Sequence, residues 1–297
     1  MSLGVPDSKL LVAAAQIDVA LFDVEANVEK HIRWITEARA QGIQLLVFPE
    51  LSLTGYKIGA RGYELGMDVR HPLLLRLAEA AGEMRVVVGF IEEGYAAQYF
   101  CAAAYLQGGR VKFVHRKLNL ANYGAMEEAK FFAAGRYLQT VPVSDPFTGA
   151  ILLCADMWNP ALVHLAALHG ATLLMAPTNS SLDAESGDFS KPGKWQIALQ
   201  FYSGMYGMPI VFANRIGTES GHTFWGGSRI MDPHGEVVAE AGRKEETLVV
   251  GELSYNSVRR TRFELPTVRD SNLSLVQREI NRLSKILGVP DPVPDDR

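Results

Sequence analysis

The sequence predicts an α/β protein built from layers of strands and helices. Short apolar runs typical of buried strands alternate with longer segments that have helical periodicity, and this alternation recurs in both halves of the 297 residues. Turn residues at Gly108-Gly109 and at 232–235 add two hairpins, whose strands must be antiparallel. A purely parallel, doubly wound sheet is therefore not expected.

In the first half, the segment 23–42 is the clearest helix. Val24, Val28, Ile32 and Ile35 share one face, and Gly42 ends the pattern. Around it we expect strands over 10–19, 43–50 and 85–93, a helix over 71–84 and a hairpin over 101–117.

The second half repeats this order. Pro160 stands at the first position of an expected helix, where proline is tolerated. The elements expected here are strands over 149–154, 171–177, 208–215 and 247–253, helices over 160–170, 193–207 and 271–288, and a hairpin over 224–241.

Composition restricts the classes of function. The net charge of −4 gives no reason to expect a nucleic-acid or anionic-membrane partner. No apolar run approaches the roughly 20 residues that span a bilayer, and the N-terminus does not read as a secretory signal. Two cysteines cannot form a disulfide framework, so we expect a cytoplasmic protein in a reducing compartment, with Cys101 as a core residue.

Three apolar strands end on reactive side chains, namely Glu50, Lys117 and Cys154. Considered one at a time, Glu50 would be interpreted as an exposed carboxylate, Lys117 as a surface lysine and Cys154 as a buried thiol. Together they suit nucleophilic catalysis, because a thiol needs a base and the carboxylate can take its proton. A nearby cation favours the thiolate and then the oxyanion.

Histidines offer an alternative base. His115 lies two residues before Lys117 and would share its face of a strand, so a Cys–His mechanism stays open. His164 and His169 are five residues apart, which places them on different faces of a helix and argues against a metal pair. No phosphate loop or dinucleotide fingerprint is present, and no metal or cofactor is expected.

Three ordered segments, 45–56, 115–135 and 151–181, resemble the signature blocks of the nitrilase superfamily of carbon–nitrogen hydrolases. The segments 23–42 and 213–241 also resemble family elements, so the likeness covers roughly residues 10–255. The resemblance implies a four-layer α-β-β-α sandwich. It also implies one hydrolase domain over 1–297, with a core of about 10–255 and a C-terminal extension over about 256–297.

The same resemblance implies a catalytic triad of Glu50, Lys117 and Cys154. It implies a second glutamate, Glu128, with Glu127 as the adjacent alternative. It further implies a homodimer or larger homo-oligomer paired through outer helices. The segment 257–283 is the least typical part, and either lies over a partner subunit or caps its own domain.

For the reaction, we expect Cys154 to attack an amide or carbamoyl carbon and form a thioester, which water then hydrolyses. Lys117 and the backbone N–H of Ala155 would stabilise the oxyanion. Family members that hydrolyse nitriles carry Trp-Glu after the cysteine, whereas Asp156 and Trp158 resemble the pattern of N-carbamoyl amine amidohydrolases and of glutaminase domains of NAD synthetases.

The substrate is therefore expected to be a small amide or N-carbamoyl amine. A glutaminase, a nitrile hydrolase, an acyltransferase and a non-catalytic binding protein of the same fold remain alternatives. The side chains expected around the substrate are Tyr56, Tyr123, Trp158 and Asn179, with rim loops over 178–195 and 214–225.

Overall fold

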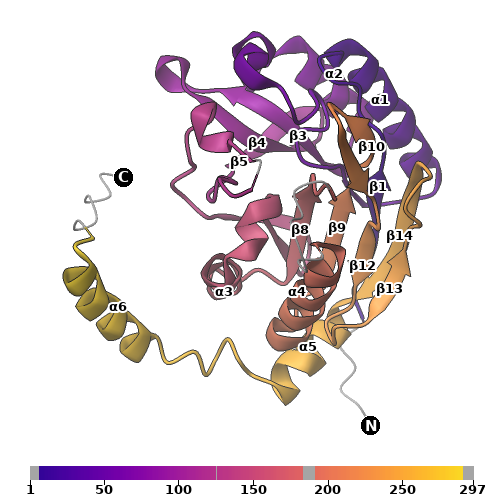
Figure 1. Ribbon diagram of the computed structural model, residues 1–297. Coiled ribbons are helices and arrows are strands. Elements are labelled where there is room, and N and C mark those ends of the chain that lie inside the picture. The colour runs from indigo at the N-terminus through magenta and orange to yellow at the C-terminus, as the bar shows by residue number, and fades with distance from the viewer. Residues whose placement is uncertain (1–6, 125, 183–190, 290–297) are drawn as a thin grey trace.

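The computed structural model describes residues 7–124, 126–182 and 191–289. Two six-stranded sheets pack face to face, and helices cover the outer face of each, which confirms the predicted α-β-β-α sandwich (Figure 1). The central strands are continuous apolar runs that are buried on both faces, and the helices bury the residues that face a sheet.

The first sheet combines parallel central strands with antiparallel edges. Its strand order is β14-β1-β2-β3-β4-β5. Strands β1 and β2 and strands β2 and β3 pair in parallel, whereas the other neighbours are antiparallel. The bounds are β1 (Lys9–Gln16), β2 (Leu45–Val47), β3 (Arg85–Glu93), β4 (Tyr99–Gln107), β5 (Arg110–Arg116) and β14 (Thr247–Ser254).

The second sheet has the same mixture of pairings. Its strand order is β13-β12-β9-β8-β7-β6, with parallel pairs β7–β8 and β8–β9 at the centre. The bounds are β6 (Thr140–Ser144), β7 (Phe147–Ile151), β8 (Leu173–Thr178), β9 (Ile210–Asn214), β12 (Arg229–Met231) and β13 (Val237–Glu240). A separate hairpin joins β10 (Ile216–Glu219) to β11 (His222–Trp225).

Helices cover both sheets. Helices α1 (Val24–Ala40) and α2 (Pro72–Ala81) cover the first sheet, and α3 (Pro160–Leu168) and α4 (Lys191–Tyr206) cover the second (Figure 1). The side chains of Asp23 and Asn159 cap the N-termini of α1 and α3. Short 3₁₀ helices are η1 (Gly59–Leu65), η2 (Tyr95–Ala97), η3 (Glu128–Lys130) and η4 (Cys154–Trp158).

The apolar core has three layers. The middle layer lies between the sheets and includes Val47, Ile91, Cys101 and Val211, all completely buried. The outer two layers lie beneath the helices on either side. Strands β2 and β7, which precede Glu50 and Cys154, are thereby fixed by packing, whereas β5, which precedes Lys117, is a half-buried edge strand.

The C-terminal helices differ in how they pack. Helix α5 (Tyr255–Glu264) continues from β14 and buries Val258 and Thr261. Helix α6 (Leu273–Leu287) stands apart from the rest of the chain at the end of an extended segment (Figure 1). None of its residues is buried. Among the described residues, no helix has both the length and the apolar character needed to cross a bilayer.

Candidate active site

The three reactive residues predicted from the sequence lie just beyond the ends of strands. Glu50 lies in the turn after β2, Lys117 directly follows β5, and Cys154 begins η4 three residues after β7 ends. The strand expected to run to Cys154 therefore ends earlier, at Ile151. Side chains placed beyond strand ends can converge because the sheets hold their backbones in fixed register.

The turn that carries Glu50 is packed from two sides. A Cβ at Gly89 of β3 would lie 2.3 Å from the backbone nitrogen of Leu51, so only glycine permits this approach. Helix α1 supports the other side: Asn27 Nδ2 donates to the carbonyl oxygen of Leu53 at 3.0 Å, and His31 Nε2 lies 2.9 Å from the hydroxyl of Ser52. The position of Glu50 is thus set by β3 and α1 together.

Lys117 lies between two carboxylates. Its Nζ donates to Oε1 of Glu50 at 2.6 Å and to Oε1 of Glu128 at 2.8 Å. Lys117 and Glu50 are completely buried and Glu128 is 5% exposed. Burial disfavours the charged ammonium, but the charges of Glu128 and Glu50 outweigh it and hold the pKa of Lys117 well above its usual value. The lysine is therefore a fixed buried cation.

Glu128 is held by further donors. The hydroxyl of Tyr56 donates to Oε1 at 2.6 Å, and the backbone N–H of Ala121 donates to Oε2 at 2.8 Å. Glu127, the adjacent alternative, is exposed and pairs with Lys130. Of the two neighbouring glutamates, only Glu128 contacts Lys117.

Cys154 has an unusual backbone conformation. Its φ of 42° lies in the left-handed region, which costs free energy for a residue with a Cβ and is common at functional sites. Burial and the negative charge of Glu50 raise the pKa of the Cys154 thiol, whereas Lys117 and a hydrogen bond from the Asn179 backbone act in the opposite direction. The net effect favours the neutral thiol, contrary to the expectation that the nearby cation would dominate.

Asp156 fixes the turn around Cys154. Its Oδ1 accepts hydrogen bonds from the backbone N–H groups of Leu118 at 3.0 Å and Asn119 at 2.7 Å, and Oδ2 accepts from the N–H of Leu153 at 3.0 Å. It is completely buried. The aspartate therefore joins the turn of Cys154 to the segment after Lys117. The position of Asp156 in the cysteine motif can be read from the sequence, but this structural role cannot.

Burial and charge also shift the pKa of Glu50. Desolvation is the largest cause and the charge of Glu128 adds to it, while Lys117 opposes both, and the pKa is raised to about 7. A carboxylate with this value is well suited to exchange protons near neutral pH.

Three of the expected substrate-binding residues line one cavity, and Tyr56 lies elsewhere. Tyr123, Ala155 and Trp158 line a cavity of about 430 Å³, together with Leu118, Asn119, Leu120, Asn122 and Ala134. Tyr123 is 45% exposed, whereas the ring of Trp158 packs against that of Trp195 with centroids 4.4 Å apart. Tyr56 instead contacts Glu128.

Asn179 contacts both Cys154 and Glu50. Its backbone makes the hydrogen bond to Cys154, and its side-chain Nδ2 donates to the backbone oxygen of Glu50 at 3.0 Å. Residues 183–190 of the predicted rim loop 178–195 lie outside the described residues. The second rim segment forms the hairpin of β10 and β11, where Glu219 accepts from the backbone N–H of Tyr56 at 2.9 Å.

His115, the alternative base, is directed to Asp156. Its Nε2 lies 3.2 Å from Oδ2 of Asp156, and both side chains are completely buried. This contact occupies the histidine in the support of the Cys154 turn. No cluster of three or more potential metal-ligating side chains occurs in the described part of the chain.

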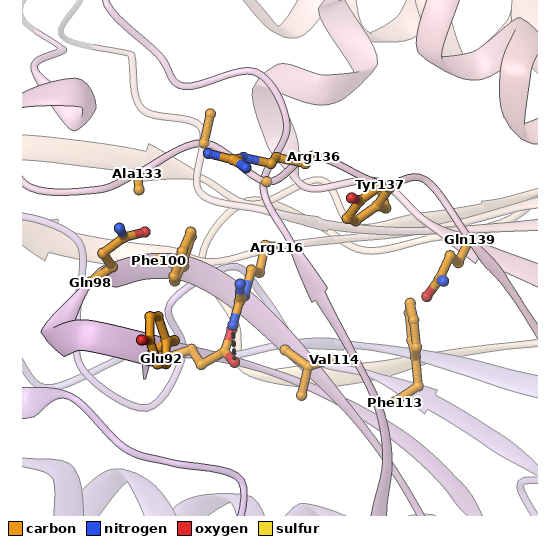
Figure 2. A pocket seen from close by; sticks show the side chains of 13 residues that line it. Glu92, Gln98, Phe100, Phe113, Val114, Arg116, Ala133, Arg136, Tyr137 and Gln139 are labelled. Atoms are coloured by element: carbon orange, nitrogen blue, oxygen red, sulfur yellow. Dashed lines mark hydrogen bonds and ion pairs between the residues drawn. The ribbon is translucent and has the colours of Figure 1, made fainter. Parts of the chain in front are cut away.

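A larger cavity of about 930 Å³ lies away from these groups, beside β4, β5 and the segment 133–139. Figure 2 shows Arg116 directed toward Glu92 within it, and the pair makes two hydrogen bonds of 2.7 and 2.8 Å. Although Arg116 is adjacent to Lys117 in sequence, it contacts different partners. The cavity thus contains none of the candidate reactive groups.

Known proteins were compared with this chain. The model of the carbon-nitrogen hydrolase family matches residues 11–263. The glutamine-dependent NAD(+) synthetase of Thermotoga maritima is 30% identical over 253 residues, which are 84% of this chain and 42% of that protein. The chain thus spans less than half the length of that relative.

Two further matches extend over nearly the whole of each relative. The N-carbamoylputrescine amidase of Solanum lycopersicum is 28% identical over 277 residues, 89% of this chain and 92% of that protein. A structure of a mutant amidase from Nesterenkonia sp. AN1, showing Michael addition of acrylamide at the active site cysteine, is 25% identical with a TM-score of 0.72. That match covers 86% of this chain and 98% of the amidase.

Proposed function

Because this chain belongs to the carbon-nitrogen hydrolase family, we propose that it hydrolyses a small amide or an N-carbamoyl amine through a thioester on Cys154. The observation that carries this proposal is the buried group of Lys117, Glu50 and Glu128, in which one ammonium lies between two carboxylates. The charges of this group act on the Cys154 thiol, which therefore has both a base and a cation available to it.

In the first half-reaction, the neutral Cys154 thiol gives its proton to Glu50 as sulfur attacks the carbonyl carbon. A proton transfer that accompanies attack fits a thiol whose pKa is raised, because little thiolate exists beforehand. The carbonyl oxygen becomes negative, and Lys117 and the N–H of Ala155 stabilise it. Loss of one such donor typically costs about 3–4 kcal/mol of barrier.

Protonated Glu50 then gives its proton to the leaving nitrogen, which departs as ammonia or an amine, and the thioester that remains completes the first half-reaction. In the second half-reaction, Glu50 accepts a proton from the water that attacks the thioester carbon, and it returns this proton to the Cys154 sulfur as the acid is released. Glu128 keeps Lys117 charged and oriented throughout, with Tyr56 and the Ala121 N–H fixing its two oxygens.

The relatives support an amide or carbamoyl substrate. One is an N-carbamoylputrescine amidase, and another is an amidase with an active-site cysteine that reacts with acrylamide. A second candidate is a glutaminase, favoured by the 30% identity to a glutamine-dependent NAD(+) synthetase. This chain matches 42% of that protein, so the match bears on the candidate glutaminase activity alone.

The test is a substrate panel of simple amides, N-carbamoyl amines, glutamine and nitriles, with release of ammonia or amine as the readout. We expect turnover of an amide or a carbamoyl amine by the wild type, and none by Cys154→Ala. Acrylamide should form a covalent adduct on Cys154 of the wild type, in which its β-carbon bonds to the sulfur and the thiol proton passes through Glu50 to the α-carbon of acrylamide. The adduct should also form in Cys101→Ala, because this variant removes the other cysteine and leaves Cys154 in place, so any adduct found there lies on Cys154. Ammonia release that persists in Cys154→Ala would reject the mechanism.

We also propose that the chain acts as one domain and pairs with a second copy through α6. The helix presents an exposed apolar stripe formed by Leu273, Val276, Ile280, Leu283 and Leu287. Isolated helices of this length are marginal in water, so the stripe needs a partner surface. Exposed Ile197, Phe201 and Met205 on α4 form a matching apolar surface on a second copy. Light scattering should show a dimer or larger assembly in the wild type and a smaller species in Ile280→Glu.

A further inference from the structure

The second thiol of the chain contacts the candidate base. Cys101 lies in β4 and is completely buried, and its Sγ donates to Oε1 of Glu50 at 3.5 Å. The backbone oxygen of Cys101 accepts a hydrogen bond of 2.8 Å from the N–H of Lys117. The sequence predicts only a packing role for this residue. The structure instead joins it to two members of the buried charged group.

The two carboxylate oxygens of Glu50 have different surroundings. Oε1 accepts from Lys117 Nζ at 2.6 Å as well as from Cys101. Oε2 is buried and has no hydrogen-bond partner among the described residues. A buried carboxylate oxygen without a partner is uncommon and marks a position where a proton or a reactant can be received.

We propose that Cys101 is a positioning residue whose thiol, together with Lys117, holds Oε1 of Glu50 and so leaves Oε2 as the atom that accepts the proton of Cys154. The inference rests on the proposed role of Glu50 as the base. The proton leaves Sγ of Cys154, moves to Oε2 and later passes to the leaving nitrogen, while Cys101 keeps its own proton. Burial and the charge of Glu50 raise the pKa of Cys101 well above its usual value, so it remains a donor at neutral pH.

The donor also affects the acidity of Glu50. A hydrogen bond to a carboxylate favours its charged form, so the Cys101 thiol lowers the pKa of Glu50 from the value that burial alone would give. Other titratable groups act on the same carboxylate from the elements around it. They are Lys117 after β5, Glu128 in η3, Cys154 in η4, and the tyrosines Tyr56 and Tyr123.

An infrared measurement tests the hydrogen bond without any substrate. The chain has two cysteines, so Cys154→Ser leaves Cys101 as the only thiol. Its S–H stretching band should lie at lower frequency than that of an unbonded thiol, and should move upward as the pH falls through about 7 and Glu50 becomes protonated. A band at the unbonded frequency that does not change with pH would overturn the proposal.

A reactivity measurement tests the consequence for Cys154. The rate of its alkylation by iodoacetamide, followed by mass spectrometry, should fall at low pH as Glu50 is protonated. Cys101→Ala and Cys101→Val both remove the S–H donor. Alanine has a smaller side chain than cysteine, whereas valine has a larger one. In both variants, the midpoint of this fall in rate at low pH should move upward by about half a pH unit. Ile91→Val is the matched control, because Ile91 pairs with Cys101 across β3 and β4 and shares its core layer.

The outcomes separate a donor role from a packing role. Equal upward shifts in Cys101→Ala and Cys101→Val, with no shift in Ile91→Val, support the proposal. Profiles that superimpose on the wild type, or a shift in only one of the two variants, overturn it. Failure of the proposed function would give a different result. The fall in the alkylation rate at low pH, seen in the wild type, would then persist unchanged in Glu50→Gln.

Discussion

The ammonium nitrogen of Lys117 lies 2.6 Å from Oε1 of Glu50, and both side chains are completely buried. An isolated buried charge is costly, and a buried pair is tolerated only where further hydrogen bonds satisfy it. Glu128 accepts a further hydrogen bond from Lys117, and Tyr56 and the Ala121 N–H donate hydrogen bonds to Glu128. The cluster is therefore a connected unit in which the loss of one member leaves another member without a partner.

The pH dependence of activity should follow from Glu50. Burial raises its pKa to about 7, and below this value the carboxylate is protonated and cannot accept the Cys154 proton. We expect kcat/KM to fall about tenfold for each pH unit well below this point. The measurement is a pH–rate profile with a neutral amide, whose own charge does not change. A profile that stays flat to pH 5 would show that Glu50 is not the titrating base.

Replacement of Glu128 should affect catalysis far more than replacement of its neighbour. Glu128→Gln removes a negative charge from the buried ammonium of Lys117, and we expect kcat to fall by about 10- to 100-fold. Glu127→Gln is the matched control, because Glu127 is exposed and pairs only with Lys130 among the described residues. Steady-state kinetics of both variants would check this. Equal effects of the two substitutions would contradict the assignment of Glu128 to the site.

Asp156 should be needed for both stability and turnover. In Asp156→Asn, an amide NH₂ replaces a carboxylate oxygen that faces backbone N–H donors, which leaves a buried donor without an acceptor. We expect a loss of about 3 kcal/mol in the free energy of unfolding, measured with urea. Asp270→Asn is the control, since the one ion pair of Asp270 within the described parts of the chain is an exposed pair with Arg269. Little change in Asp156→Asn would contradict the role of this residue in holding the Cys154 turn.

Acid should destabilise the fold through His31. Burial lowers the pKa of this histidine from 6.5 to about 4, while its hydrogen bond to Asn27 acts in the opposite direction. The unfolded chain therefore binds a proton that the folded chain does not, and stability is lost as the pH falls from about 6.5 toward 4. The effect of this one group is about 3 kcal/mol. Thermal unfolding across this range would check it, and the slope should be smaller in His31→Gln.

Local patterns in the sequence were sufficient to predict the α/β class and most elements. The helix at 23–42 and the hairpin at 101–117 were predictable because periodicity and Gly-Gly turns act within short segments. The sandwich itself came from the resemblance, and the two-sheet structure confirms it. The hairpin of β10 and β11 and the helix α5 were not predicted. Both make hydrogen bonds to segments far away in the sequence, Ile216 to Ile17 and Arg262 to Ala171, which no local pattern reveals.

Within the candidate site, some residues could be selected from the sequence, whereas their long-range contacts could not. Glu50, Lys117 and Cys154 could be selected from their positions at the ends of apolar runs. The functions of Asp156 and Cys101 could not, because each contact joins residues far apart in the sequence. An aspartate near a cysteine and a cysteine in a strand have no local feature that identifies a distant partner.

The sequence by itself therefore determined which residues are chemically capable and most of the segments that become strands and helices. Those properties depend on residue type and on spacing along a few turns of chain. Only the tertiary structure decided that Lys117 lies between Glu50 and Glu128, that Glu127 faces solvent, and that burial favours a neutral Cys154 thiol. These depend on sheet register and on desolvation, which arise only when segments far apart in the chain pack together.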